Sequence, residues 1–263
     1  MQLRDAAETL GVHYQTAYGW VRQGTLPALK TPRGYEVRES DVRDLLARRT
    51  AGTGPPCGVQ IRDWAAQAVR MYVALVTGNE AQARRQFTRI AAGAPLTTVC
   101  DQVIAPTLRR VGAGWAVGDV SIAAEHRATA ICERLIAAQV RQPRGRPRGV
   151  AVTATPPGER HALPPAMAAA CLREDHWQVN HLGADLPTAE VIALAAGAGA
   201  DLVVLSSATP RGARAAGKAA SEIRERLPQV RVLAGRPGDK LGRLCELARA
   251  PRAAGEGISE SAR

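Results

Sequence analysis

A regular alternation of short apolar runs and longer helical segments in the second half of the chain most constrains the fold. Strands are predicted over 149–155, 177–182, 201–206 and 230–234, and helices over 163–174, 187–197, 211–226 and 239–249. Such alternation predicts a parallel, doubly wound sheet with ligands at the carboxyl ends of its strands, which we assign to a domain over 149–250. No clear fifth strand follows Gly235, so the last crossover is expected to be abbreviated.

The loop after the first predicted strand carries the run Glu159-Arg160-His161. A histidine at the carboxyl edge of a parallel sheet is placed to reach a ligand. The pair Ser206-Ser207 follows the third strand and Gly235 follows the fourth. These small and hydroxyl-bearing residues are expected to line a cleft beside the sheet, with His161 at its mouth.

Residues 1–50 are predicted to form a winged helix-turn-helix domain. Helices are expected from Leu3 to Leu10, from Tyr14 to Gln23 and, after Ser40 as its N-terminal capping residue, from Asp41 to Arg49. The second helix of such a domain enters the major groove, and the wing contacts the backbone or the minor groove. The candidate DNA contacts are His13, Gln15, Thr16, Tyr18 and Arg22 near the second helix, and Lys30, Arg33 and Tyr35 on the wing. The alternative is a small helical hairpin that binds protein.

Four helices are predicted between these two domains. Their expected bounds are 60–77, 80–92, 96–116 and 120–140, and Pro106 is expected to kink the third. Short connections indicate an antiparallel four-helix bundle over 59–140. Residues 51–58 are predicted to be a flexible linker, 141–148 a basic linker and 251–263 a disordered tail.

Composition limits the cellular context and the kind of partner. The chain has 263 residues, 46% of them hydrophobic, and a formal net charge of +11, which favours a polyanionic partner. It has neither an apolar run long enough for a membrane span nor a secretory leader, so a cytoplasmic location without membrane contact is expected. Cys57, Cys100, Cys132, Cys171 and Cys245 lack CxxC spacing and are expected to be buried, reduced thiols.

The motifs of the second half resemble the cobalamin-binding Rossmann-like domain. That family has Asp/Glu-x-His-x-x-Gly, then Ser-x-Leu, then Gly-Gly, and Glu159, His161, Ser206 and Gly235 fit these patterns with matching spacing. The resemblance implies that His161 is the lower axial ligand of cobalt and that the other two motifs hold the displaced nucleotide tail. The chain departs from the patterns at Pro164, Ala208 and Ala234.

A second resemblance lies in the bundle. Ile122 stands seven positions after Trp115, Glu125 and His126 stand ten and eleven positions after it, and His161 follows thirty-five positions beyond His126. This pattern resembles cobalamin-dependent photoreceptor transcription regulators of the CarH/LitR type, and residues 1–50 resemble winged helices of the MerR and excisionase class. The resemblance implies that Trp115 covers the adenosyl group, that Glu125 hydrogen-bonds it and that His126 lines the same face.

One departure concerns the opposite side of the cobalt. The residue after the bundle tryptophan is usually a histidine that binds cobalt after light has expelled the adenosyl group, but here it is Ala116. A methyl group cannot ligate a metal. His126 is the conceivable substitute.

The predicted function is that of a non-enzymatic transcription regulator, a repressor, controlled by adenosylcobalamin. The resemblance implies self-assembly into dimers or tetramers on double-stranded operator DNA and release by light. The alternatives are a light-insensitive or cofactor-free descendant and a corrinoid carrier for methyl transfer. A metal enzyme using His161, His176 and His181 is disfavoured because their predicted positions share no face.

Overall fold

The chain divides into two units, Met1–Gln60 and Ile61–Arg263. The structure is a computed structural model, and it describes residues 1–12, 14–22, 26–31, 34–50, 63–139 and 145–250. The predicted linker over 51–58, the predicted tail over 251–263 and Cys57 lie outside the described residues, as do 141–144 of the predicted basic linker.

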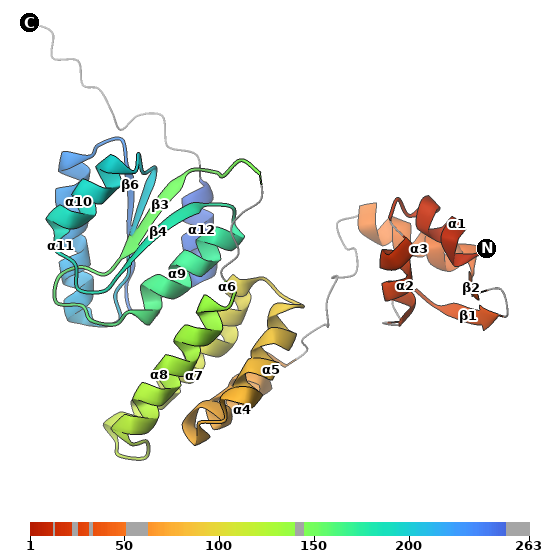
Figure 1. The fold of residues 1–263 in the computed structure, drawn as a ribbon, viewed down its shortest axis with the longest axis horizontal. Coiled ribbons are helices and arrows are strands. Elements are labelled where there is room, and N and C mark those ends of the chain that lie inside the picture. Colours follow the sequence, from red (N-terminus) through yellow and green to blue (C-terminus); the bar gives the residue numbers. More distant parts are fainter. Residues whose placement is uncertain (13, 23–25, 32–33, 51–62, 140–144, 251–263) are drawn as a thin grey trace, which may run out of the picture. The chain divides into compact units, whose positions relative to one another are not determined.

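The first unit is a helix-turn-helix with a two-stranded hairpin (Figure 1). Its elements are α1 (Leu3–Thr9), α2 (Tyr14–Arg22), β1 (Ala28–Thr31), β2 (Gly34–Val37) and α3 (Glu39–Thr50). Gly11 has a φ of +64°, which allows the tight turn between α1 and α2. Leu3, Leu26 and Leu45 are fully buried and join helices and hairpin in one small core.

The third helix of this unit begins earlier than predicted. Ser40 was expected to precede the helix, but α3 starts at Glu39, so that prediction was wrong. The backbone N–H groups of Asp41 and Val42 already donate to the carbonyl of Arg38. Since β2 ends at Val37, the chain turns into the helix within one residue, and the acidic Glu39 and Asp41 suit its positive N-terminal end.

The second unit begins with a helical bundle, here called the cap bundle (α4 to α8). Its elements are α4 (Trp64–Thr77), α5 (Glu80–Ala91), α6 (Leu96–Val99), η1 (Cys100–Ile104), α7 (Ala105–Ala116) and α8 (Ile122–Ala137). The segments α6, η1 and α7 follow one another without a break and take the place of the predicted third helix. Phe87 and Ile131 are among the large side chains buried in the bundle core.

The third helix contains a π-helical turn at η1. The N–H of Ala105 donates to the carbonyl of Cys100, five residues earlier. Pro106 follows directly and has no N–H to continue the α-helical ladder. The wider turn therefore forms immediately before the proline at which a kink was predicted.

The rest of the second unit, here called the sheet domain, has a parallel sheet in the order β4-β3-β5-β6. Its elements are β3 (Val150–Ala154), α9 (Leu163–Glu174), β4 (Gln178–Gly183), α10 (Thr188–Gly197), β5 (Leu202–Leu205), α11 (Pro210–Arg226), β6 (Arg231–Ala234) and α12 (Leu241–Arg249). The predicted doubly wound parallel sheet is thus confirmed. Within the described residues α12 follows β6 with no fifth strand between them.

Helices cover both faces of the sheet (Figure 1): α10 and α11 lie on one side, α9 and α12 on the other. The face that carries α9 shares a continuous apolar core with the cap bundle, which includes Leu172 and Leu202. Val203 and Ile223 belong to a separate core beneath α10 and α11. None of the helices in the described ranges is long and apolar enough to span a membrane.

Candidate cofactor site

The loop between β3 and α9 is held in place by its neighbours at the carboxyl edge of the sheet. The hydroxyl of Thr155 donates to the carbonyl of Glu159 and accepts the backbone N–H of Asp185 at 2.8 Å. The carboxylate of Asp185 accepts the N–H of Gly158 at 2.7 Å. Gly158 has a φ of +82°, which suits glycine. The backbone that leads to His161 is therefore fixed from two sides.

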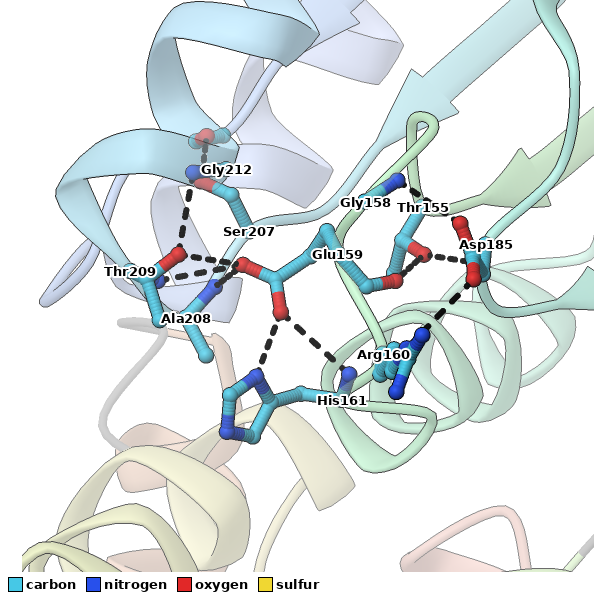
Figure 2. A network of polar contacts seen from close by, with 11 residues as sticks. Thr155, Gly158, Glu159, Arg160, His161, Asp185, Ser207, Ala208, Thr209 and Gly212 are labelled. Carbon is cyan, nitrogen blue, oxygen red and sulfur yellow. Dashed lines mark hydrogen bonds and ion pairs between the residues drawn. The ribbon is translucent and has the colours of Figure 1, made fainter.

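Glu159 is the centre of a polar network that joins two loops (Figure 2). Its side chain is 1% exposed. One carboxylate oxygen accepts the N–H of Ala208 at 3.1 Å and both the N–H and the hydroxyl of Thr209, at 3.2 and 2.9 Å. The other accepts the backbone N–H of His161 at 3.3 Å and contacts Nδ1 of its ring.

These donors decide the ionisation of Glu159. Burial alone would raise its pKa, but hydrogen bonds from His161, from Thr209 and from the N–H of Ala208 outweigh burial and lower the pKa to about 2. The carboxylate is therefore a buried anion at neutral pH, compensated by donors on every side.

One ring nitrogen of His161 contacts Glu159, and the other is available to a ligand. Nδ1 contacts Glu159, whereas the side chain is 57% exposed and Nε2 has no protein partner among the described residues. A histidine that binds a metal typically donates its other ring N–H to a carboxylate, which fixes the tautomer and raises the basicity of the free nitrogen. The arrangement fits an imidazole that presents Nε2 to a metal.

The predicted residues of the nucleotide-tail slot lie on the same sheet edge. Ser206 and Ser207 are 9% and 7% exposed and follow directly after β5. The hydroxyl of Ser207 donates to the carbonyl of Gly235 at 2.6 Å, and the N–H of Gly235 donates to Leu205 at 2.8 Å. The ends of β5 and β6 are thereby joined beside the His161 loop.

Arg160 differs from its two neighbours in the loop. Its side chain is 88% exposed, and its Nε lies 3.6 Å from a carboxylate oxygen of Asp185. Because an exposed ion pair of this kind is weak, the Arg160 side chain can change conformation to contact a ligand.

The predicted upper-face residues form a second group at the α7–α8 end of the cap bundle. Trp115 and Ile122 are 51% and 59% exposed, which is unusual for large apolar side chains. Glu125 accepts a hydrogen bond from Thr129 at 3.2 Å and lies 3.8 Å from Nε2 of His126. In the described part of the chain no hydrogen bond or ion pair joins this group to the His161 loop.

Ala116 lies beside Trp115 as the last residue of α7 and is exposed. Among the described residues no group of three His, Cys, Asp or Glu side chains is arranged to hold a metal ion by itself. A metal at His161 would therefore have to bring most of its other ligands with it, as a corrin macrocycle does.

The candidate DNA contacts are distributed unevenly over the first unit. Gln15, Thr16 and Lys30 are exposed. Tyr18 packs its ring against Tyr35 at a centroid distance of 5.6 Å, so these two residues also fasten α2 to the hairpin. His13, Arg33 and the side chain of Arg22 lie outside the described residues.

Two residues that organise the site were not among the predicted site residues. Thr209 joins Glu159 to the N-terminus of α11, where its hydroxyl also accepts the N–H of Gly212 at 2.9 Å. The Thr-Pro pair before that helix is a recognisable N-terminal capping signal, but its contact with Glu159 is not encoded locally. Asp185 gave no signal, since it acts through a loop after a different strand.

Comparison with known families finds matches in three stretches of the chain. Residues 149–239 match a family described as a B12 binding domain, residues 67–138 match a second B12 binding domain family, and residues 1–50 match a helix-turn-helix domain family. Fold and site thus define a protein that combines a helix-turn-helix domain with the two parts of a cobalamin-binding module.

A curated relative matches the chain over most of its length. Over 258 residues the chain is 26% identical to the HTH-type transcriptional repressor CarH of Myxococcus xanthus, an alignment that covers 85% of this chain and 84% of that protein. The predicted resemblance to CarH-type cobalamin-binding transcription regulators is thereby confirmed. The monomethylamine corrinoid protein of Methanosarcina barkeri shares the fold, with a TM-score of 0.56 and 16% identity over 70% of this chain and 97% of that one.

Proposed function

We propose that this chain is a transcriptional repressor that binds double-stranded DNA only while it holds adenosylcobalamin. The observation that carries the proposal is the buried Glu159 carboxylate that orients the exposed His161 ring. His161 would be the lower axial ligand, because its Nε2 is open while Nδ1 is fixed.

Each remaining site residue has a role in this proposal. Ser206, Ser207 and Gly235 would border the nucleotide tail, and Arg160 would reach polar groups at the rim of the corrin. Trp115 and Ile122 would exclude water from the upper face, where their exposed apolar surface would be covered. Glu125 would accept hydrogen bonds from ribose hydroxyls, with His126 beside it.

The cofactor supplies a cobalt–carbon bond that light can break. The exposed side chains of Trp115 and Ile122 would pack on the adenosyl moiety and would be uncovered without it. Ala116 cannot provide a second protein ligand, so His161 would hold the metal, and His126 is the other histidine of the proposed site.

Assembly would link this site to DNA. In the proposal the cofactor-bound chain forms dimers or tetramers that place several helix-turn-helix domains on one operator, with Gln15, Thr16 and Lys30 among the contacts. The cofactor can change the free energy of assembly only by the difference between its binding free energies for the assembled and the dissociated state.

A DNA-binding titration tests the regulatory claim. A duplex that the protein selects from a random library would be titrated with apo protein, with adenosylcobalamin-loaded protein in the dark and with loaded protein after green illumination. Tight binding is expected only in the dark, loaded state. Equal binding by apo protein would refute cofactor dependence.

Absorption spectroscopy tests the ligand. His161→Ala is expected to lose the spectrum of imidazole-ligated adenosylcobalamin and to bind the cofactor more weakly. His176→Asn is the matched control, because His176 is an exposed histidine outside the site whose positive φ asparagine tolerates. Unchanged spectra in both variants would exclude His161 as the ligand.

A light-insensitive descendant is the second candidate, favoured by Ala116 and by the departures at Pro164, Ala208 and Ala234. Spectra and size-exclusion profiles of loaded protein that stay the same under illumination would establish it. A corrinoid carrier shares the fold of cap bundle and sheet domain, but the helix-turn-helix match over residues 1–50 favours regulation.

A further inference from the structure

Helix α5 presents two different charged faces. On one face, Glu80 pairs with Arg84 at 3.1 Å and with Arg134 of α8 at 2.8 Å. On another face, Gln82, Arg85, Gln86 and Arg89 recur at the spacing of successive helical turns. The only acidic residue of α5 is thus engaged on the α8 side, away from Arg85 and Arg89.

That second face forms a pocket with α4. The pocket has a volume of about 240 Å³ and is lined by Arg70, Gln82, Arg85, Gln86 and Arg89. All three arginines are exposed, and no carboxylate is among the lining residues. The nearest acidic residue along α4 is Asp63, which is engaged at the N-terminus of that helix with the N–H of Ala66.

The side of the pocket toward the bundle is built from a buried polar pair. Gln67 and Gln86 are 9% and 7% exposed. The amide of Gln86 donates to the backbone carbonyl of Gln67 at 2.7 Å and to its side-chain oxygen at 3.0 Å. The same side-chain oxygen accepts from Arg89 at 3.3 Å. A satisfied polar pair between packed helices is a specific arrangement, and here it holds one guanidinium at the pocket.

The electrostatics of the pocket call for an anion. Three guanidinium groups around one concavity repel each other, and no carboxylate offsets them among the described residues that line it. Guanidinium groups present paired N–H donors that match the oxygens of a phosphoryl group. We propose that this pocket is a phosphate-binding site, separate from the cobalamin site, which takes either a free phosphate compound or a phosphate of the DNA backbone.

Titration of the full chain without cobalamin tests the proposal by calorimetry with inorganic pyrophosphate. The double variant Arg85→Gln/Arg89→Gln is expected to weaken saturable binding by roughly tenfold or more. Arg84→Gln is the matched control: it removes one positive charge from the same helix but on the face that pairs with Glu80, and it should leave the affinity within about twofold.

A second titration, with a duplex of random sequence, separates the two sources of phosphate. If pyrophosphate does not bind but duplex affinity falls in the double variant and not in Arg84→Gln, the phosphate belongs to DNA. If the double variant alters neither titration, or Arg84→Gln has an equal effect, the proposal is overturned. Because no cofactor is present, these outcomes do not depend on the proposed regulation by cobalamin.

Discussion

Glu159 occupies a space that one glycine keeps open. A Cβ at Gly212 would lie 2.0 Å from the carboxylate oxygen that Thr209 and Ala208 bind. The carboxylate, the N-terminus of α11 and the orientation of His161 therefore depend on the absence of a single methyl group.

Gly212→Ala should displace Glu159 even though alanine favours helix. We expect the free energy of unfolding to fall by about 1–3 kcal/mol, the usual cost of overpacking, and cobalamin affinity to fall with it. Gly217→Ala in the same helix has open space around its Cβ, so it should raise stability by up to about 1 kcal/mol. Urea denaturation of both variants measures the two changes in the free energy of unfolding. If both variants changed stability in the same direction, the proposed role of Gly212 in leaving space for Glu159 would be contradicted.

Candidate site residues can be proposed from the sequence where their signal is local. The Glu-x-His pair can be read from the sequence because both residues belong to one loop. The contacts of Thr209 and Asp185 with that loop were not predicted, because these residues reach it from the ends of other strands, which meet only at the folded edge of the sheet. Tyr18 and Tyr35 were predicted as DNA contacts from position alone, and their mutual packing depends on how the hairpin closes on α2.

Ion pairing at the start of α5 connects two helices of the cap bundle. Glu80 receives hydrogen bonds from Arg134 of α8 and from Arg84. The bonds from Arg134 are the main cause that lowers its pKa from 4.5 to about 2. The folded state therefore binds a proton at Glu80 less readily than the unfolded chain does.

The pH dependence of this pair follows from that sign. Its contribution is fully present above pH 4.5 and is lost as the pH falls toward about 2. Glu80→Gln should lower Tm at neutral pH, and the gap from the unsubstituted protein should narrow steadily below pH 4.5. Glu133→Gln, which replaces an exposed glutamate of α8, should show a smaller and flatter gap in calorimetric scans. A Glu80→Gln gap that widened in acid would refute the pairing.

Boundaries of the elements were predictable to within a few residues, because apolar periodicity and glycine or proline breaks mark them. The start of α3 lies two residues before the predicted Asp41, since it depends on how little chain follows β2. The π-helical turn was not predictable. Pro106 predicts an interruption of the α-helical hydrogen bonds. Whether this interruption takes the form of a bend or of a wider turn depends on the packing of α6 and α7 against their neighbours.

The cap bundle and the sheet domain are joined by two carboxylates that cross between them. Asp101 of η1 accepts the N–H groups of Leu241 and Gly242 at 2.8 and 3.0 Å, at the start of α12. In return, Glu174 of α9 accepts the N–H of Leu96, the first residue of α6, at 2.8 Å. Each domain thus satisfies a helix N-terminus of the other.

Asp101→Ala is expected to cost about 1–2 kcal/mol, the usual loss for a helix N-terminal carboxylate. Asp63→Ala removes a similar contact at α4 within the cap bundle alone and is the matched control. Hydrogen exchange distinguishes them, because only Asp101→Ala should raise exchange at the first residues of α12. Similar exchange in both variants would mean that α12 does not depend on the cap bundle.

The strands and helices within each domain could be predicted more fully than the contacts between the cap bundle and the sheet domain. Strand alternation and helical periodicity are properties of short segments, and they predicted the sheet, its abbreviated end and the cap bundle. The pairs Asp101–Leu241 and Glu174–Leu96 join residues far apart in the chain, and no sequence pattern marks them. The same holds for the arginine pocket, which exists only once α4 and α5 lie side by side.

The π-helical turn in the third helix affects the direction in which the side chains after it point. Each residue of an α-helix advances the chain by about 100° around its axis, so an uninterrupted α-helix of the same residues would turn everything after η1 about that angle further around the axis. Val111 is buried and Trp115 exposed in this orientation. Deleting one residue between Cys100 and Ile104 would leave a more regular α-helix in which the indole keeps its present direction, because the wider turn already absorbs the extra residue. The direction in which Trp115 points is thus set by the wider turn at η1, about three helical turns before it.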